Sequence, residues 1–212
     1  MLIGERMSRP VLSIPPDMPI HDVRNMFKQE NIRRAPVVKK GKMIGIVSDQ
    51  DIINASPSMA TSLSVWELTY LLSKIQAKDV MTKDVLTIDE DTPIEQAARL
   101  MADNKIGGLP VMRDGKVVGM ITETDLFKVF LELMGARDPG VRVTALVDNK
   151  PGVLQKITGA ISEAGGNFLS LGIFTGEDVS TNILTFKVDG IEKEVVKKEI
   201  WDIVKEVWDI RE

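Results

Sequence analysis

The chain has 212 residues, 43% of them hydrophobic and 27% charged, which is ordinary for a globular protein of one long domain or two. The net charge of −4 disfavours a nucleic-acid binder, while the lack of cysteine and the single histidine exclude disulfides and the common Cys and His metal sites. No apolar run is long enough to cross a membrane and no signal-peptide core is present, so we expect a cytoplasmic protein without a membrane partner.

The first predicted element is a short strand within residues 7–14, where Val11 supplies a β-type side chain. Three prolines then prevent a helix from starting before Ile20. Ile20, Val23 and Phe27 lie on one helical face, which predicts a helix over this stretch.

Two further strands and a helix are predicted next. One strand starts at Ala35-Pro36, since a strand accepts proline at its first position. The turn at Lys40-Gly41 leads into an apolar run over residues 42–47. That run ends at Ser48, where a helical apolar pattern begins. The unit therefore reads strand, helix, strand, turn, strand, helix.

The same pattern returns 74 residues later. Residues 7–54 align with residues 81–128 without a gap, with 14 identities in 48 positions. In the second copy, Thr92-Pro93-Ile94-Glu95 predicts a capping box with proline at the first helical position. A duplicated unit of about 50 residues is too small to bury a core alone, so we expect the two copies to pack together as one module.

Each copy carries the pattern Gly-x-x-[Ser/Thr]-x-x-Asp at a strand-to-helix junction, ending in Ser48 and Asp51 or in Thr122 and Asp125. Unpaired amides and the positive end of the helix dipole favour an anion there, and the aspartate has oxygens that accept from a ribose diol. The alternative is a capping box that satisfies the helix's own amides. The sequence leaves both interpretations open.

Residues 61–76 are predicted to form a helix between the repeats, starting at the capping box Ser64-Val65-Trp66-Glu67. It resembles half of a helix-turn-helix, but no second helix follows at the required turn, so we expect no nucleic-acid partner. Trp66 and Tyr70 are expected to make packing or dimer contacts.

The turn-rich segment 135–140 predicts a linker, followed by a strand at residues 141–147 and a helix with Leu154 and Ile157 on its inner face. Two strands, a second helix and a final short strand complete the order β-α-β-β-α-β, which is typical of ferredoxin-like folds.

The duplicated unit with its repeated junction resembles the cystathionine-β-synthase (CBS) domain, which occurs in tandem pairs. The resemblance covers roughly residues 1–134. It implies two related clefts for an adenosine-containing ligand such as AMP, ADP, ATP or S-adenosylmethionine, bound as a regulatory ligand and not as a cofactor. Aspartate would hold ribose, the hydroxyl residue would approach phosphate, and strand residues would flank adenine. The residues implied are Val11, Arg33, Arg34, Ala35, Pro36, Ser48, Asp51, Val85, Leu109, Pro110, Thr122 and Asp125.

The two clefts are expected to differ. Arg33-Arg34 precedes the proline strand in the first copy, whereas Gly107-Gly108 precedes it in the second. Guanidinium matches phosphate oxygens well, so the first cleft is expected to prefer ligands with phosphate. The alternative is that the arginines belong to a solvated loop.

The C-terminal region resembles the ACT domain, on the pattern Asp148-x-x-Pro151-Gly152-x-Leu154 and the Gly166-Asn167 pair. Many ACT domains bind amino acids, and amides at a helix start suit a carboxylate. The alternative is an Asx-type turn at Asp148-Asn149. The residues implied in ligand binding are Asn149, Lys150, Pro151, Gly152, Val153, Leu154 and Asn167.

Together these patterns predict an α+β protein with CBS repeats at 1–60 and 77–134 and an ACT domain at 141–212, similar to the acetoin-utilization type of regulator. We expect a homodimeric, non-catalytic sensor of an adenosine compound that acts on a partner protein, with an amino acid or small carboxylate as a second ligand left open. The alternative is a constitutive scaffold that no longer binds ligand. Catalysis is disfavoured, because the only histidine, His21, lies in a helix turn and no carboxylates pair at catalytic spacing.

Overall fold

A computed structural model describes residues 1–55, 70 and 73–212. The chain divides into two compact units, Met1–Leu126 and Phe127–Glu212. The helix predicted at residues 61–76 lies largely outside the described residues. The predicted boundaries of the repeats and of the ACT domain, at 1–60, 77–134 and 141–212, stay a prediction. Within the described part of the chain, no helix has the length and apolar character needed to cross a membrane.

The first repeat comprises α1 (Ile20–Gln29), β1 (Arg34–Lys39), β2 (Lys42–Ser48) and α2 (Asp49–Ala55). The hairpin turn has positive φ at both Lys40 and Gly41, as predicted from its sequence. The strand predicted within residues 7–14 is not formed, and the segment makes isolated bridges instead, from Ser8 to Met120 and from Ile14 to Val37. The reason is that the prolines around this segment lack the N–H that a longer ladder needs.

The second repeat comprises α4 (Ala77–Val80), β3 (Ile88–Asp89), α5 (Ile94–Asn104), β4 (Gly108–Arg113), β5 (Lys116–Thr122) and α6 (Glu123–Leu133). The capping box predicted at Thr92 is wrong, because Pro93 is the N-cap and makes no side-chain cap bond. The backbone serves instead, since Ile94 N donates to Met1 O at 3.2 Å.

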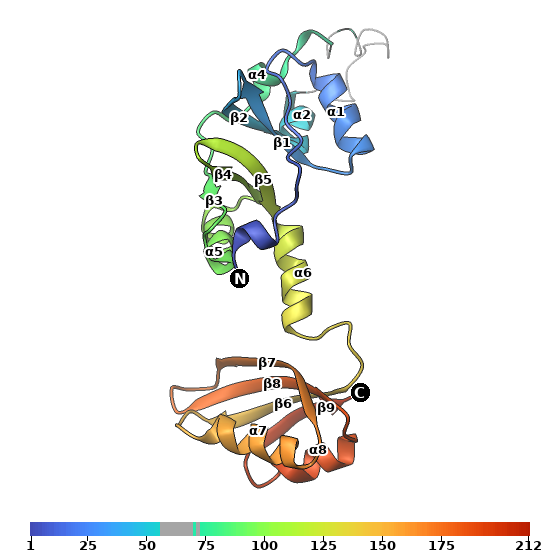
Figure 1. Ribbon diagram of the computed structural model, residues 1–212, viewed down its shortest axis with the longest axis vertical. Coiled ribbons are helices and arrows are strands. Elements are labelled where there is room, and N and C mark those ends of the chain that lie inside the picture. The colour runs from blue at the N-terminus through green and yellow to red at the C-terminus, as the bar shows by residue number, and fades with distance from the viewer. Residues whose placement is uncertain (56–69, 71–72) are drawn as a thin grey trace. The chain divides into compact units, whose positions relative to one another are not determined.

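The core of each repeat includes a segment that, in the sequence, comes just before the other repeat. Ile3 and Met7 belong to the core of the second repeat, beside Leu109 and Ile121, and Figure 1 shows this N-terminal segment next to α5. The core of the first repeat in turn includes Ala77, with its neighbours at residues 75–81 packed against it.

Hydrogen bonds fix both exchanged segments to a strand. Ile46 and Thr82 exchange two backbone bonds of 3.0 and 2.9 Å, and Ser8 and Met120 exchange two of 2.8 and 3.3 Å. The glycine of each motif stands at the crossing, because a Cβ at Gly45 would meet the Met81 sulfur at 2.6 Å and the Thr82 carbonyl at 2.8 Å. The pairing confirms that the repeats form one module.

The second unit contains a four-stranded sheet in the order β7-β8-β6-β9. Its elements are β6 (Val141–Asp148), α7 (Val153–Glu163), β7 (Asn167–Thr175), β8 (Thr181–Asp189), α8 (Lys193–Ile200) and β9 (Glu206–Arg211). Both helices cover one face of the sheet (Figure 1), and Phe186, Ile157 and Ile200 are fully buried between them. Residues 135–138 are held to β8, because Lys187 Nζ donates to the carbonyls of Gly135 and Asp138.

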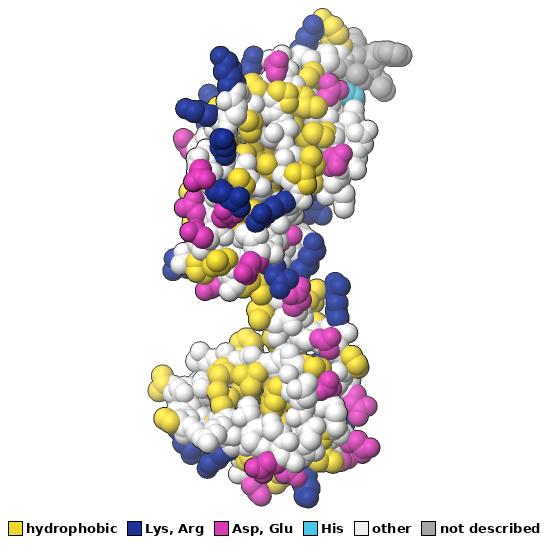
Figure 2. All heavy atoms as spheres, viewed as in Figure 1, with side chains coloured by type: hydrophobic (Ala, Val, Ile, Leu, Met, Phe, Trp, Pro, Cys, Tyr) yellow, Lys and Arg dark blue, Asp and Glu magenta, His cyan; other side chains and the backbone are white. Residues whose placement is uncertain are grey.

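Hydrophobic side chains gather on the visible surface of each unit, among charged ones (Figure 2). Among the exposed apolar residues are three at helical spacing on α6, with exposed fractions of 68% for Phe127, 53% for Phe130 and 62% for Leu133.

Candidate functional site

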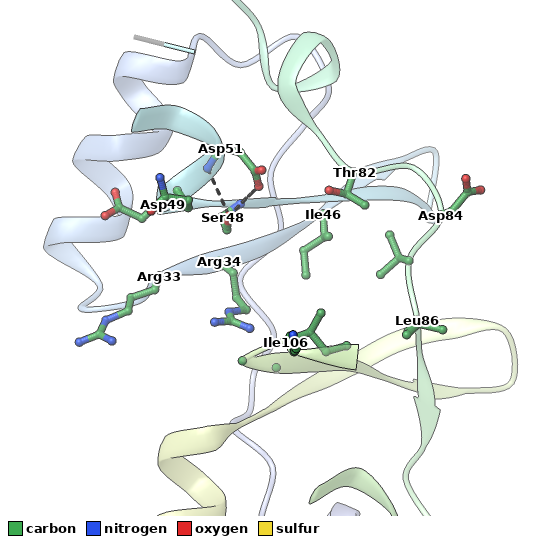
Figure 3. A pocket seen from close by; sticks show the side chains of 15 residues that line it. Arg33, Arg34, Ile46, Ser48, Asp49, Asp51, Thr82, Asp84, Leu86 and Ile106 are labelled. Carbon is green, nitrogen blue, oxygen red and sulfur yellow. Dashed lines mark hydrogen bonds between the residues drawn. The ribbon is translucent and has the colours of Figure 1, made fainter. Parts of the chain in front are cut away.

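A cavity of about 630 Å³ lies in the first unit, where the start of α2 meets the chain that enters the second repeat. Five of the predicted ligand residues line it, namely Arg33, Arg34, Ser48, Asp51 and Val85. They come from both repeats, since Val85 belongs to the exchanged segment that follows Thr82 (Figure 3). The cavity is therefore a product of the exchange and not of one repeat alone.

In the motif at this cavity, Ser48 and Asp51 hydrogen-bond to each other through side chains and backbone amides. Ser48 donates to Asp51 Oδ2 twice, from its backbone N at 2.7 Å and from its Oγ at 2.6 Å. The backbone N of Asp51 donates back to Ser48 Oγ at 3.3 Å. The capping interpretation is thus confirmed. Since no described residue donates to Asp51 Oδ1, capping leaves one carboxylate oxygen available to a ligand.

The second copy of the motif has the same local geometry. Thr122 donates to Asp125 Oδ2 from its N at 3.0 Å and from its Oγ1 at 2.7 Å. Asp125 is more buried, at 7% exposed, and neither residue lines the cavity described above. Val11 is half-buried and also lies outside that cavity.

Four predicted residues serve the core. Ala35 and Leu109 are completely buried, and the adjoining prolines are buried as well. None of them lines the cavity. The four residues predicted to bind ligand in the proline strands, Ala35, Pro36, Leu109 and Pro110, are therefore buried parts of β1 and β4.

The arginines and the paired glycines lie at one cavity, which corrects the expected assignment to two clefts. Gly107 and Gly108 line the same cavity as Arg33 and Arg34. A Cβ at Gly107 would stand 2.6 Å from Arg34 Nη2, and a Cβ at Gly108 would stand 2.9 Å from Arg34 Nη1. Burial lowers the pKa of Arg34 below its ordinary value, and the Glu123 carboxylate partly offsets that effect.

The remaining walls were not foreseen from the sequence. Ile46, Leu86 and Ile106 give the cavity an apolar side, and Lys105 adds a third cation. Ile46 points inward from β2, while Leu86 and Ile106 belong to the second repeat (Figure 3). The sequence offered one clue to Leu86, which is the neighbour of the predicted ligand residue Val85. The exchange of segments brings both residues to the cavity that Ser48 lines. The cavity combines an apolar slot with three cations and with the carboxylates of Asp49, Asp51 and Asp84.

The second unit has a smaller cavity of about 370 Å³ beside the start of α7. Five predicted residues line it, namely Asn149, Lys150, Pro151, Val153 and Leu154, whereas Gly152 and Asn167 do not. Gly152 is the helix N-cap, with φ of 90°.

The polar side chains at this smaller cavity are already engaged. Asn149 Nδ2 donates to Val179 O at 2.9 Å, and its Oδ1 accepts from Asn182 at 3.1 Å. Hydrogen bonds from Lys150 and Lys205 hold the pKa of Asp148 below its usual range. Among the described residues, no cluster of histidine, aspartate and glutamate is arranged to hold a metal ion.

Comparison with known families assigns both regions. The model of the CBS domain matches residues 3–58 and 77–132, which together exceed half of the chain. The model of the AHAS small subunit-like ACT domain matches residues 143–207.

Three relatives place these matches in context. Uncharacterized protein MJ1426 of Methanocaldococcus jannaschii is 32% identical over 155 residues, covering 62% of this chain and 92% of the relative. The CBS domain pair of protein MJ0100, solved with 5′-methylthioadenosine and S-adenosyl-L-methionine, is 26% identical with a TM-score of 0.52, covering 65% and 98%. A putative acetoin utilization protein (AcuB) from Vibrio cholerae, at 24% identity and a TM-score of 0.54, shares the fold over 65% of this chain and 96% of its own. The chain spans only 47% and 38% of two other curated relatives.

Proposed function

Because the chain belongs to the CBS-domain family and carries an ACT-like domain, we propose that it is a non-catalytic regulatory protein that senses an adenosine-containing ligand. The observation that carries the proposal is one cavity that combines Asp51, an apolar slot and two arginines. The MJ0100 domain pair, which is similar over 65% of this chain, was solved with two adenosyl compounds.

Each part of such a ligand has a matching group. Asp51 Oδ1 accepts from a ribose hydroxyl while Oδ2 stays bonded to Ser48. An adenine ring fits between apolar side chains such as Val85 and Ile106. The guanidinium groups of Arg33 and Arg34 serve a phosphate, since charge-assisted bonds of this kind are strong.

Binding would regulate by favouring one state of the protein. A ligand shifts a population only by binding one state better than another, so the ligand must distinguish arrangements of this module. We place the protein in the cytoplasm, with an unidentified partner protein as its target. The cavity at Lys150 is proposed for an amino acid or small carboxylate, because it lies at the start of α7, where backbone amides favour an anion.

A constitutive scaffold is the second candidate, and one observation favours it. Asp51 and Asp125 both cap a helix, so their presence is explained without any ligand. A scaffold would keep both residues and bind no adenosine compound.

Calorimetry with AMP, ADP, ATP, S-adenosylmethionine, 5′-methylthioadenosine and adenosine separates the candidates. A sensor binds at least one of these compounds, whereas a scaffold binds none. Asp51→Asn keeps an oxygen for Ser48 but removes the charge, and it should weaken binding roughly tenfold or more, because a hydrogen bond to a charged group contributes about 1.5–3 kcal/mol. Asp125→Asn changes the equivalent cap away from the cavity and is the matched control.

The phosphate contact is tested separately. Arg33→Ala/Arg34→Ala should weaken AMP binding roughly tenfold or more and leave adenosine nearly unchanged, on the same magnitude of charge-assisted bond. Arg24→Ala, an exposed arginine on α1, is the control. Equal loss of AMP and adenosine would show that the arginines do not contact phosphate.

A further inference from the structure

The second repeat leaves a space that a side chain of the first repeat fills. At the alignment offset, Gly107 corresponds to Arg33 and Gly108 to Arg34. The Arg34 guanidinium lies against both glycines, within 2.6 to 2.9 Å of where their Cβ atoms would stand. A larger residue at either position would clash with the guanidinium, so the side chain of Arg34 can occupy this space because both residues are glycine.

A carboxylate stands on the other side of the same space. Glu123 Oε2 lies 2.9 Å from the position of a Gly107 Cβ, and Glu123 N donates to Gly107 O at 3.3 Å. In the first repeat the equivalent backbone bond runs from Asp49 N to Arg33 O at 2.8 Å. The residue in the place of Gly107 is there an arginine, which has a full side chain. At Gly107 an arginine and a carboxylate therefore both approach the position that a side chain would occupy.

The two groups interact electrostatically while one of them faces the ligand cavity. Arg34 lines the cavity and is half-buried, whereas Glu123 is exposed and opens α6, directly after Thr122. Burial lowers the pKa of Arg34, and the Glu123 carboxylate, which stands beside the same Gly107 position, acts in the opposite direction. The other charged groups at this cavity are Arg33, Asp49, Asp51, Asp84 and Lys105.

We infer that Arg34 and Glu123 form a charge-reading pair, in which Glu123 competes with the ligand's 5′ substituent for Arg34. This inference rests on the proposed function. An anionic substituent such as a phosphate draws the guanidinium away from Glu123 and meets repulsion from the carboxylate. A neutral or cationic substituent leaves the pair intact. Glu123 therefore sets how strongly the cavity prefers phosphate. Because Glu123 lies in the first turn of α6, next to Thr122, the charge of the ligand's 5′ substituent also changes the electrostatic environment of the second motif.

Glu123→Gln is the direct test, measured by calorimetry at low salt with AMP, adenosine and S-adenosylmethionine. Removing the competing charge should raise AMP affinity several-fold, leave adenosine unchanged and weaken the cationic S-adenosylmethionine. The gain for AMP should shrink at 0.3 M NaCl, because Glu123 is exposed and its charge is screened. Glu95→Gln removes the same charge from the first turn of α5 and is the matched control.

A double-mutant cycle tests the route through Arg34. In an Arg34→Ala background, Glu123→Gln should lose most of its effect on AMP, because no guanidinium remains to be contested. If wild-type protein binds AMP but Glu123→Gln leaves the ratio of AMP to adenosine affinity unchanged, the pair is refuted while the proposed function stands. If wild-type protein binds none of the three compounds, the proposed function fails and the pair with it.

Discussion

At the scale of single residues, the motif aspartate has two separable tasks. Asp51 caps α2 through Oδ2, and as a residue that lines the cavity it has a second carboxylate oxygen for a ligand. The capping bonds hold the carboxylate in one orientation, which lowers the entropy that a ligand hydroxyl must offset on binding. The capping and ligand interpretations of the sequence are therefore compatible.

The motif glycine is fixed by close approach of the exchanged segment. Gly45→Ala would place a Cβ 2.8 Å from the Thr82 carbonyl, so we expect a loss of about 1–3 kcal/mol in the free energy of unfolding. Gly159→Ala is the contrasting variant, because it lies in α7 with no atom within 4 Å of the new Cβ. It should gain about 0.5–1 kcal/mol from helix propensity. Urea denaturation measures both, and equal stability of the two variants would contradict the crossing at Gly45.

At the scale of elements, exchanged segments make each repeat dependent on the other. The first repeat buries Ala77 completely and packs residues 75–81 against its core. A fragment of residues 1–60 lacks that segment, so we expect it not to fold as a stable monomer. Circular dichroism and urea titration provide the measurement, with residues 1–126 as the control that retains both segments. Cooperative unfolding of the short fragment as a monomer would contradict this dependence.

The edge strand β9 is tied to β6 by a carboxylate. Asp209 accepts from Arg142 at 3.0 Å, and hydrogen bonding from Arg211 is the main cause that lowers its pKa. A lowered folded pKa means that the stabilisation is complete above the ordinary value of 3.8 and is lost as pH falls through the folded value.

Asp209→Asn should therefore reduce stability at pH 7 and flatten the acid loss of stability below about pH 4. Urea unfolding at several pH values is followed by the fluorescence of Trp201 and Trp208 in a Trp66→Phe background, so that the signal reports on this unit. Asp202→Asn is an exposed control on the same unit. Parallel pH profiles for Asp209→Asn and wild type would refute the assignment.

Much of each element was predictable because local chemistry determined it. The hairpin turn at Lys40-Gly41 was identifiable, because such turns need positive φ at both residues. The exchange of segments was not predictable, because apolar spacing is the same whether Met7 packs on its own repeat or on the other. For the same reason the sequence assigned Arg34 and Gly107 to different clefts.

At the scale of the whole molecule, we predict a homodimer at least. The four-stranded sheet has edges at β7 and β9, and α6 exposes Phe127, Phe130 and Leu133. Exposed edges and apolar stripes of this kind are usually covered by another chain. Sedimentation should show a species heavier than 23.5 kDa at micromolar concentration, and Phe127→Glu/Phe130→Glu should weaken the association. A 23.5 kDa species alone would refute the dimer.

The exchanged N-terminal segment also sets the order of events during synthesis. Ile3 leaves the ribosome about a hundred residues ahead of its core partners Leu109 and Ile121. At about 5–20 residues per second, the segment waits on the order of several seconds before those partners exist. The first repeat waits for Ala77, but its described core uses residues no later than Met81, so it can close before the second copy has been translated. The second core alone must wait for the second copy, so Ile3 and Met7 have no completed core to enter until Leu109 and Ile121 have been translated.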